Sequence, residues 1–287
     1  MTNSTKAQGT GTALTRTFRR GILVALAIVA GAVSLGLAKP VQADNLTLYA
    51  TSFEPPVFKV GDKLLGLDGW SAAIPPFLNP DAAIITGAAA SNRKQSVEVY
   101  GGDLIGSDGA TAPYDAVGSY RRPIGFDGSD GFPIAARQSR VHCDADLLLE
   151  TNQPATPGEF FSMTISARSG DGETLGEAGL SSQGIAVGFP FDVAPGSEPA
   201  VQAPIQFNQW YRVSMLLDYV NHTTSYFLDG RPLGTVPAPT ASNVLLRIAI
   251  VVYARPDGDS TGGAGSQRAN YTARFDNLRV RVNSAHN

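Results

Sequence analysis

The feature that most limits the fold of this chain is a succession of short runs of β-branched and aromatic residues from residue 44 onward. Clusters of Gly, Pro, Asn and Asp separate these runs, and the chain contains 31 Gly and 19 Pro. No stretch keeps the period of an amphipathic helix for three turns. This pattern is typical of antiparallel sheets, so we predict an all-β fold built as a two-sheet antiparallel β-sandwich.

The strongest strand signal is a three-stranded meander in the second half of the chain. Its strands are predicted at Trp210–Asp218, Thr223–Leu228 and Arg231–Val236. The first turn is built on Asn221-His222, and the second on Asp229-Gly230, where glycine supplies the positive φ that a tight hairpin requires. The turns therefore fix the register of the three strands.

Seven further strands are expected along the chain. They are predicted at Asn45–Ser52, Ser96–Tyr100, Ser139–Glu150, Glu159–Ala167, Gly184–Phe189, Val244–Tyr253 and Tyr271–Val280. Segments rich in Gly and Pro, such as Val193 to Pro204, are expected to be loops. No linker is long or biased enough to divide the chain, so residues 44–287 are predicted to form a single domain.

The first 43 residues have the composition of a secretory signal peptide. They contain five basic residues, no acidic residue, and an apolar run from Ile22 to Ala38. Val41-Gln42-Ala43 supplies a small-x-small cleavage pattern, so cleavage after Ala43 is expected. The alternative is an uncleaved N-terminal anchor, because the apolar run is close to the shortest length that spans a bilayer. The mature protein is expected to be secreted, periplasmic or extracellular, and the short signal and single cysteine favour a bacterial source.

Net charge and cysteine content exclude several classes of function. Without the leader, 17 basic residues stand against 25 acidic ones, a net charge of −8, and the basic residues are spread along the chain. This argues against nucleic acid and favours neutral partners such as polysaccharides. No second apolar stretch reaches membrane length, so no membrane contact is expected after cleavage. One cysteine allows neither a disulfide framework nor a cysteine-based zinc site.

Three segments together resemble a known superfamily. They are Phe207-Asn-Gln-Trp-Tyr-Arg-Val213, Tyr226-Phe-Leu-Asp-Gly-Arg-Pro-Leu-Gly234 and Phe275-Asp-Asn-Leu-Arg-Val280. They are similar to the concanavalin A-like lectin/glucanase superfamily, specifically its laminin-G-like jelly rolls. The opening Ser52-Phe-Glu54 and Gly66-Leu-Asp-Gly-Trp70 also resemble secreted bacterial members of that group. The resemblance implies two stacked sheets with a groove on one outer face, and it covers lectins, glycosidases, lyases and adhesion modules.

Residues 140–150 alternate between two sets of side chains, as a strand requires. The apolar set, which we assign to the core, is Val141, Cys143, Ala145, Leu147 and Leu149. Cys143 is then predicted to be a buried, inert thiol. The polar set is Arg140, His142, Asp144, Asp146 and Glu150.

Within the polar set, Asp144 and Asp146 are the best candidates for a catalytic carboxylate pair. Residues two apart on a strand lie about 6.6 to 6.8 Å from each other on one face, near the separations used in glycoside hydrolysis. His142 and Glu150 are candidates to assist. The glucanases of the resembling superfamily carry Glu-x-Asp-x-x-Glu, which this chain lacks. The favoured alternative is a solvated polar sheet face without catalysis.

Ligand-binding candidates are aromatic residues in or near predicted loops. Tyr100, Tyr114, Tyr120 and Tyr253 are placed to stack on sugar rings, with Arg140 from the polar set beside them. Packing in the core or at its rim is the alternative for each ring, because sandwich cores also use aromatics. Trp210 is assigned to structure, because it opens the first meander strand.

Calcium is the metal that the loops favour. Asp257 with Asp259, and Asp127 with Asp130, place carboxylates among glycines, which suits an oxygen-seeking cation. Neither segment completes an EF-hand loop, and ordinary turn formation is the alternative. Laminin-G-like relatives often hold one calcium at the sandwich rim, so the resemblance also favours it.

The sequence therefore predicts a secreted module that binds carbohydrate or an extracellular surface and performs no chemistry. One alternative is a polysaccharide hydrolase or lyase that uses Asp144, Asp146 and Glu150 on a concave sheet. A second is a structural protein of the envelope or matrix that associates with itself through an exposed sheet edge. A serine hydrolase is disfavoured, because no Gly-x-Ser-x-Gly motif occurs in the chain.

Overall fold

The computed structural model describes most of the chain after residue 45. The described residues are 46–73, 79–91, 93–104, 116–124, 131–134, 140–151, 160–189, 199–238, 244–255 and 271–283. Residues 42–287 form one compact unit. The predicted signal peptide lies outside the described residues. Within the described ranges, no helix has the length and apolar character needed to cross a membrane.

Two antiparallel sheets make up the fold, and every strand pairing that the structure describes is antiparallel. The first sheet contains β1 (Leu46–Thr51), β3 (Ala83–Thr86), β4 (Ser96–Tyr100), β7 (Arg140–Thr151), β12 (Trp210–Asp218), β13 (Thr223–Leu228), β14 (Arg231–Pro237) and β16 (Tyr271–Asn283). The second sheet contains β2 (Ser71–Ala73), β5 (Ala116–Pro123), β6 (Phe132–Pro133), β8 (Phe160–Ser169), β9 (Thr174–Ser181), β10 (Ile185–Phe189), β11 (Val201–Pro204) and β15 (Val244–Arg255). The short helices are η1 (Leu67–Gly69), η2 (Pro80–Ala82) and α1 (Gly101–Leu104).

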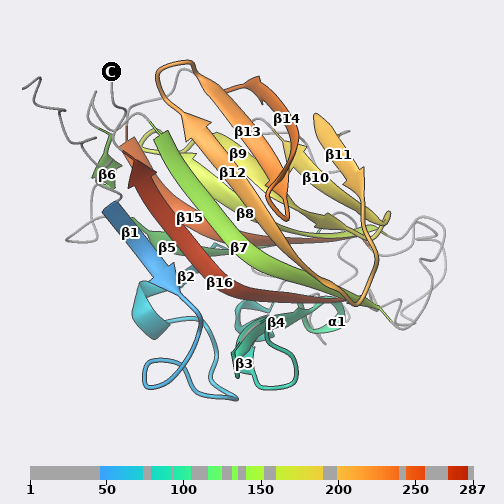
Figure 1. Ribbon diagram of the computed structural model, residues 1–287. Coiled ribbons are helices and arrows are strands. Elements are labelled where there is room, and N and C mark those ends of the chain that lie inside the picture. Colours follow the sequence, from blue (N-terminus) through green and yellow to red (C-terminus); the bar gives the residue numbers. More distant parts are fainter. Residues whose placement is uncertain are drawn as a thin grey trace, which may run out of the picture. The chain divides into compact units, whose positions relative to one another are not determined.

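The two sheets are stacked. The first runs in the order β14-β13-β12-β7-β16-β4-β3, with β1 beside β16. The second runs in the order β11-β10-β9-β8-β15-β5-β2, with β6 beside β15. In Figure 1, β12, β7 and β16 of the first sheet lie over β8, β9 and β15 of the second. The predicted all-β sandwich is therefore confirmed, and the architecture is the one that the concanavalin A-like resemblance implies.

One hydrophobic core fills the space between the sheets. Val141, Cys143 and Leu147 of β7 are fully buried in it, together with Ile248 and Ile250 of β15. Each large apolar side chain buried in this way contributes about 1.5 to 3 kcal/mol. The predicted apolar set of residues 140–150 belongs to this core, so the residues between its members point to the outer face of the first sheet.

The meander and its turns form as predicted. β12 and β13 begin and end at the predicted residues, and β14 extends one residue beyond Val236. Asp229 and Gly230 adopt φ of 50° and 75°, and His222 adopts φ of 49°. The predicted strand at Ser96–Tyr100 also has the observed bounds.

Five strands of the second sheet were not predicted, namely β2, β5, β6, β9 and β11, and neither was β3 of the first sheet. β9 reads Thr-Leu-Gly-Glu-Ala-Gly-Leu-Ser, so Thr174 is its only β-branched residue, and the run does not have the composition that marks a strand. Its glycines allow close packing, because a Cβ at Gly179 would lie 1.9 Å from the Met163 carbonyl oxygen. β11 lies inside the segment from Val193 to Pro204, which the sequence predicts to be a loop. That prediction was wrong for residues 201–204, where the backbone pairs with β10.

The aromatic residues occupy different places from those expected. Trp70 is 2% exposed, and its Nε1 donates a hydrogen bond to the Tyr49 hydroxyl at 3.1 Å. Tyr120 is fully buried in the core, so its predicted role in stacking on a ligand is wrong. Trp210, which opens β12, is only partly buried. Alternation on β12 explains this, since Trp210 shares a face with Arg212 rather than with the core residues Tyr211 and Val213.

Candidate functional site

The outer face of the first sheet carries the predicted carboxylate pair. Asp144 and Asp146 lie two residues apart on β7, with Arg212 of β12 opposite Asp146 on one side and Asp276 of β16 opposite it on the other. The exposed fractions of Asp144 and Asp146 are 4% and 5%. The favoured prediction of a solvated polar face is therefore wrong for these two residues.

Asp146 is held by three hydrogen-bond donors. The Arg212 Nε donates to its Oδ1, while the Ser91 hydroxyl and the Asn277 amide donate to its Oδ2 at 2.6 and 2.7 Å. Burial by itself raises the pKa of the Asp146 carboxyl, but the hydrogen bonds from these three groups and the Arg212 charge hold that pKa below its usual value. Asp146 is therefore an ionised, fully engaged carboxylate.

The two neighbouring carboxylates are also engaged. Asp144 lies 3.6 Å from a guanidinium nitrogen of Arg212 and 3.4 Å from one of Arg281. Asp276 is fully buried and accepts hydrogen bonds from the backbone N–H groups of Ser91 at 3.0 Å and Asn277 at 2.7 Å. Burial, with the nearby charge of Asp146, raises the pKa of Asp276 to about 6.

The remaining members of the predicted catalytic set serve the same network. Glu150 accepts a hydrogen bond from the Arg274 Nε at 2.8 Å, and Arg274 also pairs with Glu98. Burial, together with the charge of Arg281, lowers the pKa of His142. A glycosidase needs a carboxyl group that can reach the sugar oxygen or carbon. Asp144, Asp146 and Glu150 pair with arginines of adjacent strands, and these ion pairs link β7 to β12 and β16.

Three arginines gather on the outer face of the second sheet. Arg168 of β8 and Arg247 of β15 are direct register partners, and Arg121 of β5 pairs with Ala249, the next outward-facing position of β15. All three side chains are partly exposed. We refer to Arg121, Arg168 and Arg247 as the arginine cluster. Burial lowers the pKa of Arg121, and the charges of Arg247 and Arg168 lower it further.

A buried acid lies beside this cluster. Glu177 of β9 is 5% exposed and accepts a hydrogen bond from the Thr164 hydroxyl at 2.8 Å. Burial raises the pKa of Glu177, while the Thr164 hydrogen bond, the charge of Arg168 and a hydrogen bond from Tyr253 act in the opposite direction. The predicted ligand residue Tyr253 therefore contacts this polar face of the second sheet.

Sequence reasoning missed the arginine cluster because its members come from three distant strands. Only the cross-strand register brings Arg121, Arg168 and Arg247 together. One signal was present in the sequence: Arg247 begins an outward-facing set on β15 that continues with Ala249, Val251 and Tyr253. That signal does not show which strands lie beside β15.

The other predicted site residues do not gather at one place. Tyr100 is partly buried at the end of β4, and Arg140 is exposed, with its Nε donating to Asp218 at 3.1 Å. Cys143 is fully buried, and burial raises the pKa of its thiol, as an inert cysteine requires. Tyr114, Asp127, Asp130, Asp257 and Asp259 lie outside the described residues. Among the residues that are described, no three His, Cys, Asp or Glu side chains group as metal ligands.

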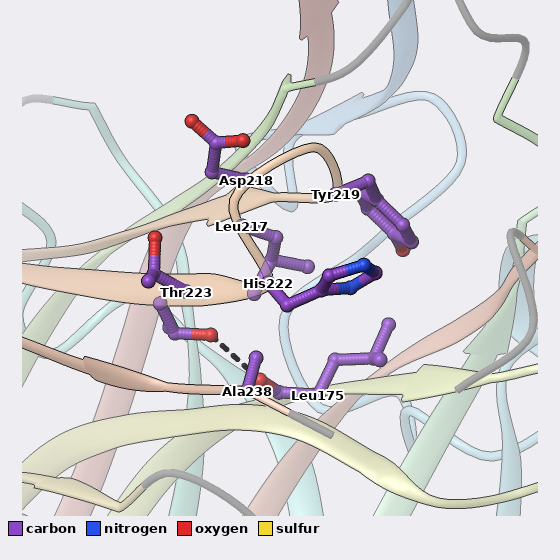
Figure 2. A pocket seen from close by; sticks show the side chains of 8 residues that line it. Leu175, Leu217, Asp218, Tyr219, His222, Thr223 and Ala238 are labelled. Atoms are coloured by element: carbon purple, nitrogen blue, oxygen red, sulfur yellow. Dashed lines mark hydrogen bonds between the residues drawn. The ribbon is translucent and has the colours of Figure 1, made fainter. Parts of the chain in front are cut away.

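Neither described hollow coincides with these charged faces. A small hollow next to the first meander turn is lined by Leu175, Leu217, Asp218, Tyr219, His222, Thr223, Thr224 and Ala238. The His222 imidazole lies beside Tyr219 there (Figure 2). The hollow has a volume of about 10 Å³, which is room for roughly one water molecule. A more open depression of about 360 Å³ lies between Pro204 and Tyr211.

Comparisons with known proteins give loose structural similarities. No protein-family model matches the sequence, and no curated protein matches it. Similar solved structures include the cellulose induced protein Cip1, at 14% identity and a TM-score of 0.46, covering 81% of this chain and 96% of that chain. An endo-β-1,4-glucuronan lyase from the fungus Trichoderma reesei is similar at 11% identity and a TM-score of 0.45, covering 82% and 95%. A sialidase is similar at 15% identity and a TM-score of 0.43, covering 74% of this chain but only 17% of the sialidase chain.

TM-scores below 0.5 at 11 to 15% identity mark a distant likeness, and neither a family nor an activity of this chain follows from it. The function therefore has to be argued from the residues of the two outer faces.

Proposed function

We propose that this chain is a secreted or periplasmic β-sandwich domain that binds carbohydrate and performs no chemistry. The observation that carries the non-catalytic part is the state of the predicted carboxylate pair. Asp144 and Asp146 are 4% and 5% exposed, and both are paired with Arg212. A substrate would have to displace this guanidinium before it reached either carboxylate.

The binding part rests on the fold and on the second outer face. Sheet faces are rigid platforms on which side chains from several strands reach one extended ligand. On the second sheet, the arginine cluster lies at one end and Tyr253 farther along β15, and these partly exposed side chains are the ones that a ligand can reach, because Ala249 and Val251 between them are buried. Together with the acidic composition of the mature chain and its predicted leader, this favours an extracellular glycan over nucleic acid.

The enzyme alternative requires the network of Asp146 to open. The proposal predicts that the protein releases no new reducing ends and no unsaturated products from any polysaccharide that it binds. Asp146→Asn should then change stability but leave glycan binding unaltered. Cleavage of a bound polymer by the wild type, lost in Asp146→Asn, would refute the non-catalytic proposal.

Affinity electrophoresis tests the binding itself. The purified protein is run through gels that contain neutral or acidic polysaccharides, with and without a chelator. Retardation in at least one gel supports the proposal, and its loss with the chelator would indicate calcium in the site. Unchanged mobility in every gel would contradict it and favour a self-associating structural protein, which light scattering at high concentration would reveal as concentration-dependent assembly.

A further inference from the structure

We propose that the arginine cluster of Arg121, Arg168 and Arg247 is a subsite for an oxyanion carried by a polysaccharide, a uronate carboxylate or a sulfate ester. This inference rests on the proposed carbohydrate-binding function and names the class of sugar that the site takes. It goes against the preference for neutral glycans that net charge alone suggests.

The first argument is a difference between the two sheets. On the first sheet, Arg212, Arg274 and Arg281 all lie against Asp or Glu side chains. On the second sheet, no ion pair joins Arg121 or Arg247 to a carboxylate within the described part of the chain. The Arg121 Nε donates a hydrogen bond to the neutral Ser119 hydroxyl at 3.3 Å.

The second argument is an unsatisfied donor. In the described part of the chain, the Nε of Arg247 is one of several buried side-chain atoms without a hydrogen-bond partner, and the first sheet also has such atoms, at Asp144 and Arg281. Buried polar groups without a partner are uncommon in folded proteins, and a bound water or ion is one explanation for them. The Arg247 guanidinium group as a whole is still partly exposed, so an external acceptor can reach it.

The third argument is electrostatic. Arg247 faces Arg168 directly across the β8–β15 pairing, and Arg121 lies one outward-facing position further along β15. Like charges at such separations repel, and partial burial weakens the screening by water. Glu177 offsets part of this repulsion, because its carboxylate interacts with the charge of Arg168 while it also accepts the Thr164 hydroxyl. One bound anion would relieve both the repulsion and the unpartnered donor.

The chemistry of the cluster favours one oxyanion on a sugar rather than a densely charged polymer. A planar guanidinium donates two parallel hydrogen bonds to a carboxylate or sulfate, which a neutral hydroxyl cannot match. Polyanions such as nucleic acid are bound through many phosphate contacts by proteins with broad basic surfaces. Here the mature chain is acidic, so three converging arginines suit local recognition of a single charged group.

The test uses a double variant, Arg121→Gln/Arg247→Gln, which removes the two arginines without a carboxylate partner. The variant breaks no described ion pair, so it should fold. Its circular dichroism spectrum should match that of the wild type, and its melting temperature should be equal to or higher than that of the wild type. Arg231→Gln is a control for the loss of one positive charge outside the cluster, because Arg231 is exposed at the start of β14 in the first sheet. Arg247→Lys keeps the charge but loses the planar fork.

The probes are polymers that differ only in the anion. Polygalacturonate is compared with its methyl-esterified form, and dextran sulfate with dextran, in affinity gels at low and moderate salt. We expect retardation by at least one charged polymer, and weakening of about tenfold or more in the double variant, as loss of hydrogen bonds to a charged group implies. Arg247→Lys should retain part of the binding and Arg231→Gln all of it. The polymer pair that responds tells carboxylate from sulfate.

Three results would overturn the inference. Retardation by charged polymers that is equal in the wild type and the double variant would place the anion elsewhere, while the proposed carbohydrate-binding function would stand. Retardation by neutral polymers alone would show that the site does not take an anion, and the proposed carbohydrate-binding function would again stand. Unchanged mobility in all four gels and in a wider panel of polysaccharides would contradict the proposed function and this inference together.

Discussion

Replacing Arg212 with methionine tests the conclusion that the carboxylates of β7 are structural. The substitution keeps a long apolar stem but removes the guanidinium that donates to Asp146 and lies 3.6 Å from Asp144. Asp146 would retain its hydrogen bonds from Ser91 and Asn277, and Asp144 would retain Arg281 at 3.4 Å. The change therefore leaves two buried carboxylates short of one cation.

The structure sets the expected magnitude. Removing one partner of a buried ion pair costs about 3 to 5 kcal/mol. The Arg212 side chain is 38% exposed, whereas the Asp146 side chain is 6% exposed, so water already screens part of the interaction. With two hydrogen bonds left on Asp146, we expect a loss of about 2 to 3 kcal/mol in the free energy of unfolding at pH 7.

The cost should depend on pH in a defined direction. The pKa of Asp146 in the folded protein is lower than the ordinary value of 3.8 for this side chain. The stability that the ion pair contributes is thus present above the unfolded pKa and is lost as pH falls through the lower folded pKa. The Arg212→Met penalty should be full at pH 7 and should shrink below about pH 4.

Urea unfolding at pH 7 and pH 3 measures the loss of stability in Arg212→Met. Asp146→Asn and the double variant Arg212→Met/Asp146→Asn complete a double-mutant cycle. A coupling energy of about 2 kcal/mol between Arg212 and Asp146 is expected at pH 7, since the pair shares one buried interaction. A penalty below about 1 kcal/mol, or one that is equal at both pH values, would show a solvated pair. The carboxylates would then be free for chemistry, and the enzyme alternative would regain its main support.

Three further predictions concern the fold and the network. Trp70→Ala should lower the free energy of unfolding in urea by about 3 to 5 kcal/mol, because the ring is 2% exposed. Trp210→Ala should lower it by only about 1 to 2 kcal/mol, because that ring is partly buried; equal losses would contradict the assigned burial. Gly179→Ala should lower stability by about 3 kcal/mol or more, because its Cβ would meet the β8 backbone, while Gly87→Ala, whose nearest contact is 3.5 Å, should be nearly neutral; similar melting temperatures for the two would argue against the close β8–β9 approach. Asp276 should titrate with a pKa of about 6 by carboxyl NMR. Its contribution to the free energy of unfolding, about 3 kcal/mol, is then full below pH 3.8 and is lost as pH rises through 6; a pKa near 4 would mean that the carboxyl is hydrated.

The parts of the fold that could be predicted are those specified by local sequence. Asp229-Gly230 determines its hairpin because few residue pairs adopt positive φ at both positions. Strict alternation over residues 140–150 assigned each side chain of β7 to a face. β9 escaped prediction because its glycines are explained only by the β8 backbone beside it. The partial burial of Trp210 could not be predicted, because the burial of an outward-facing ring depends on neighbours in space.

The candidate site was only half predictable for a related reason. That Asp144 and Asp146 share one face follows from the period of a strand. Their partners do not follow, because the arginines that contact Asp146, Glu150 and Asp144 lie 66, 124 and 137 residues away in the chain. Without those arginines, two carboxylates on one face look the same whether they await a substrate or hold neighbouring strands together.

The two faces of the sandwich differ in how their arginines are partnered, and the proposed anion subsite rests on this difference. On the first sheet, the arginines neutralise buried acids, so the folded chain itself accounts for both charges. On the second sheet, Arg121 and Arg247 add repulsion and an unpartnered donor with no described gain for the fold. Replacing such residues with apolar ones usually leaves a fold equally or more stable, so stability alone does not explain them. A local cost without a structural gain is typical of a functional site. On the second sheet this cost includes the repulsion among the arginines, which is why the proposed subsite is placed there rather than at the ion-paired carboxylates of the first sheet.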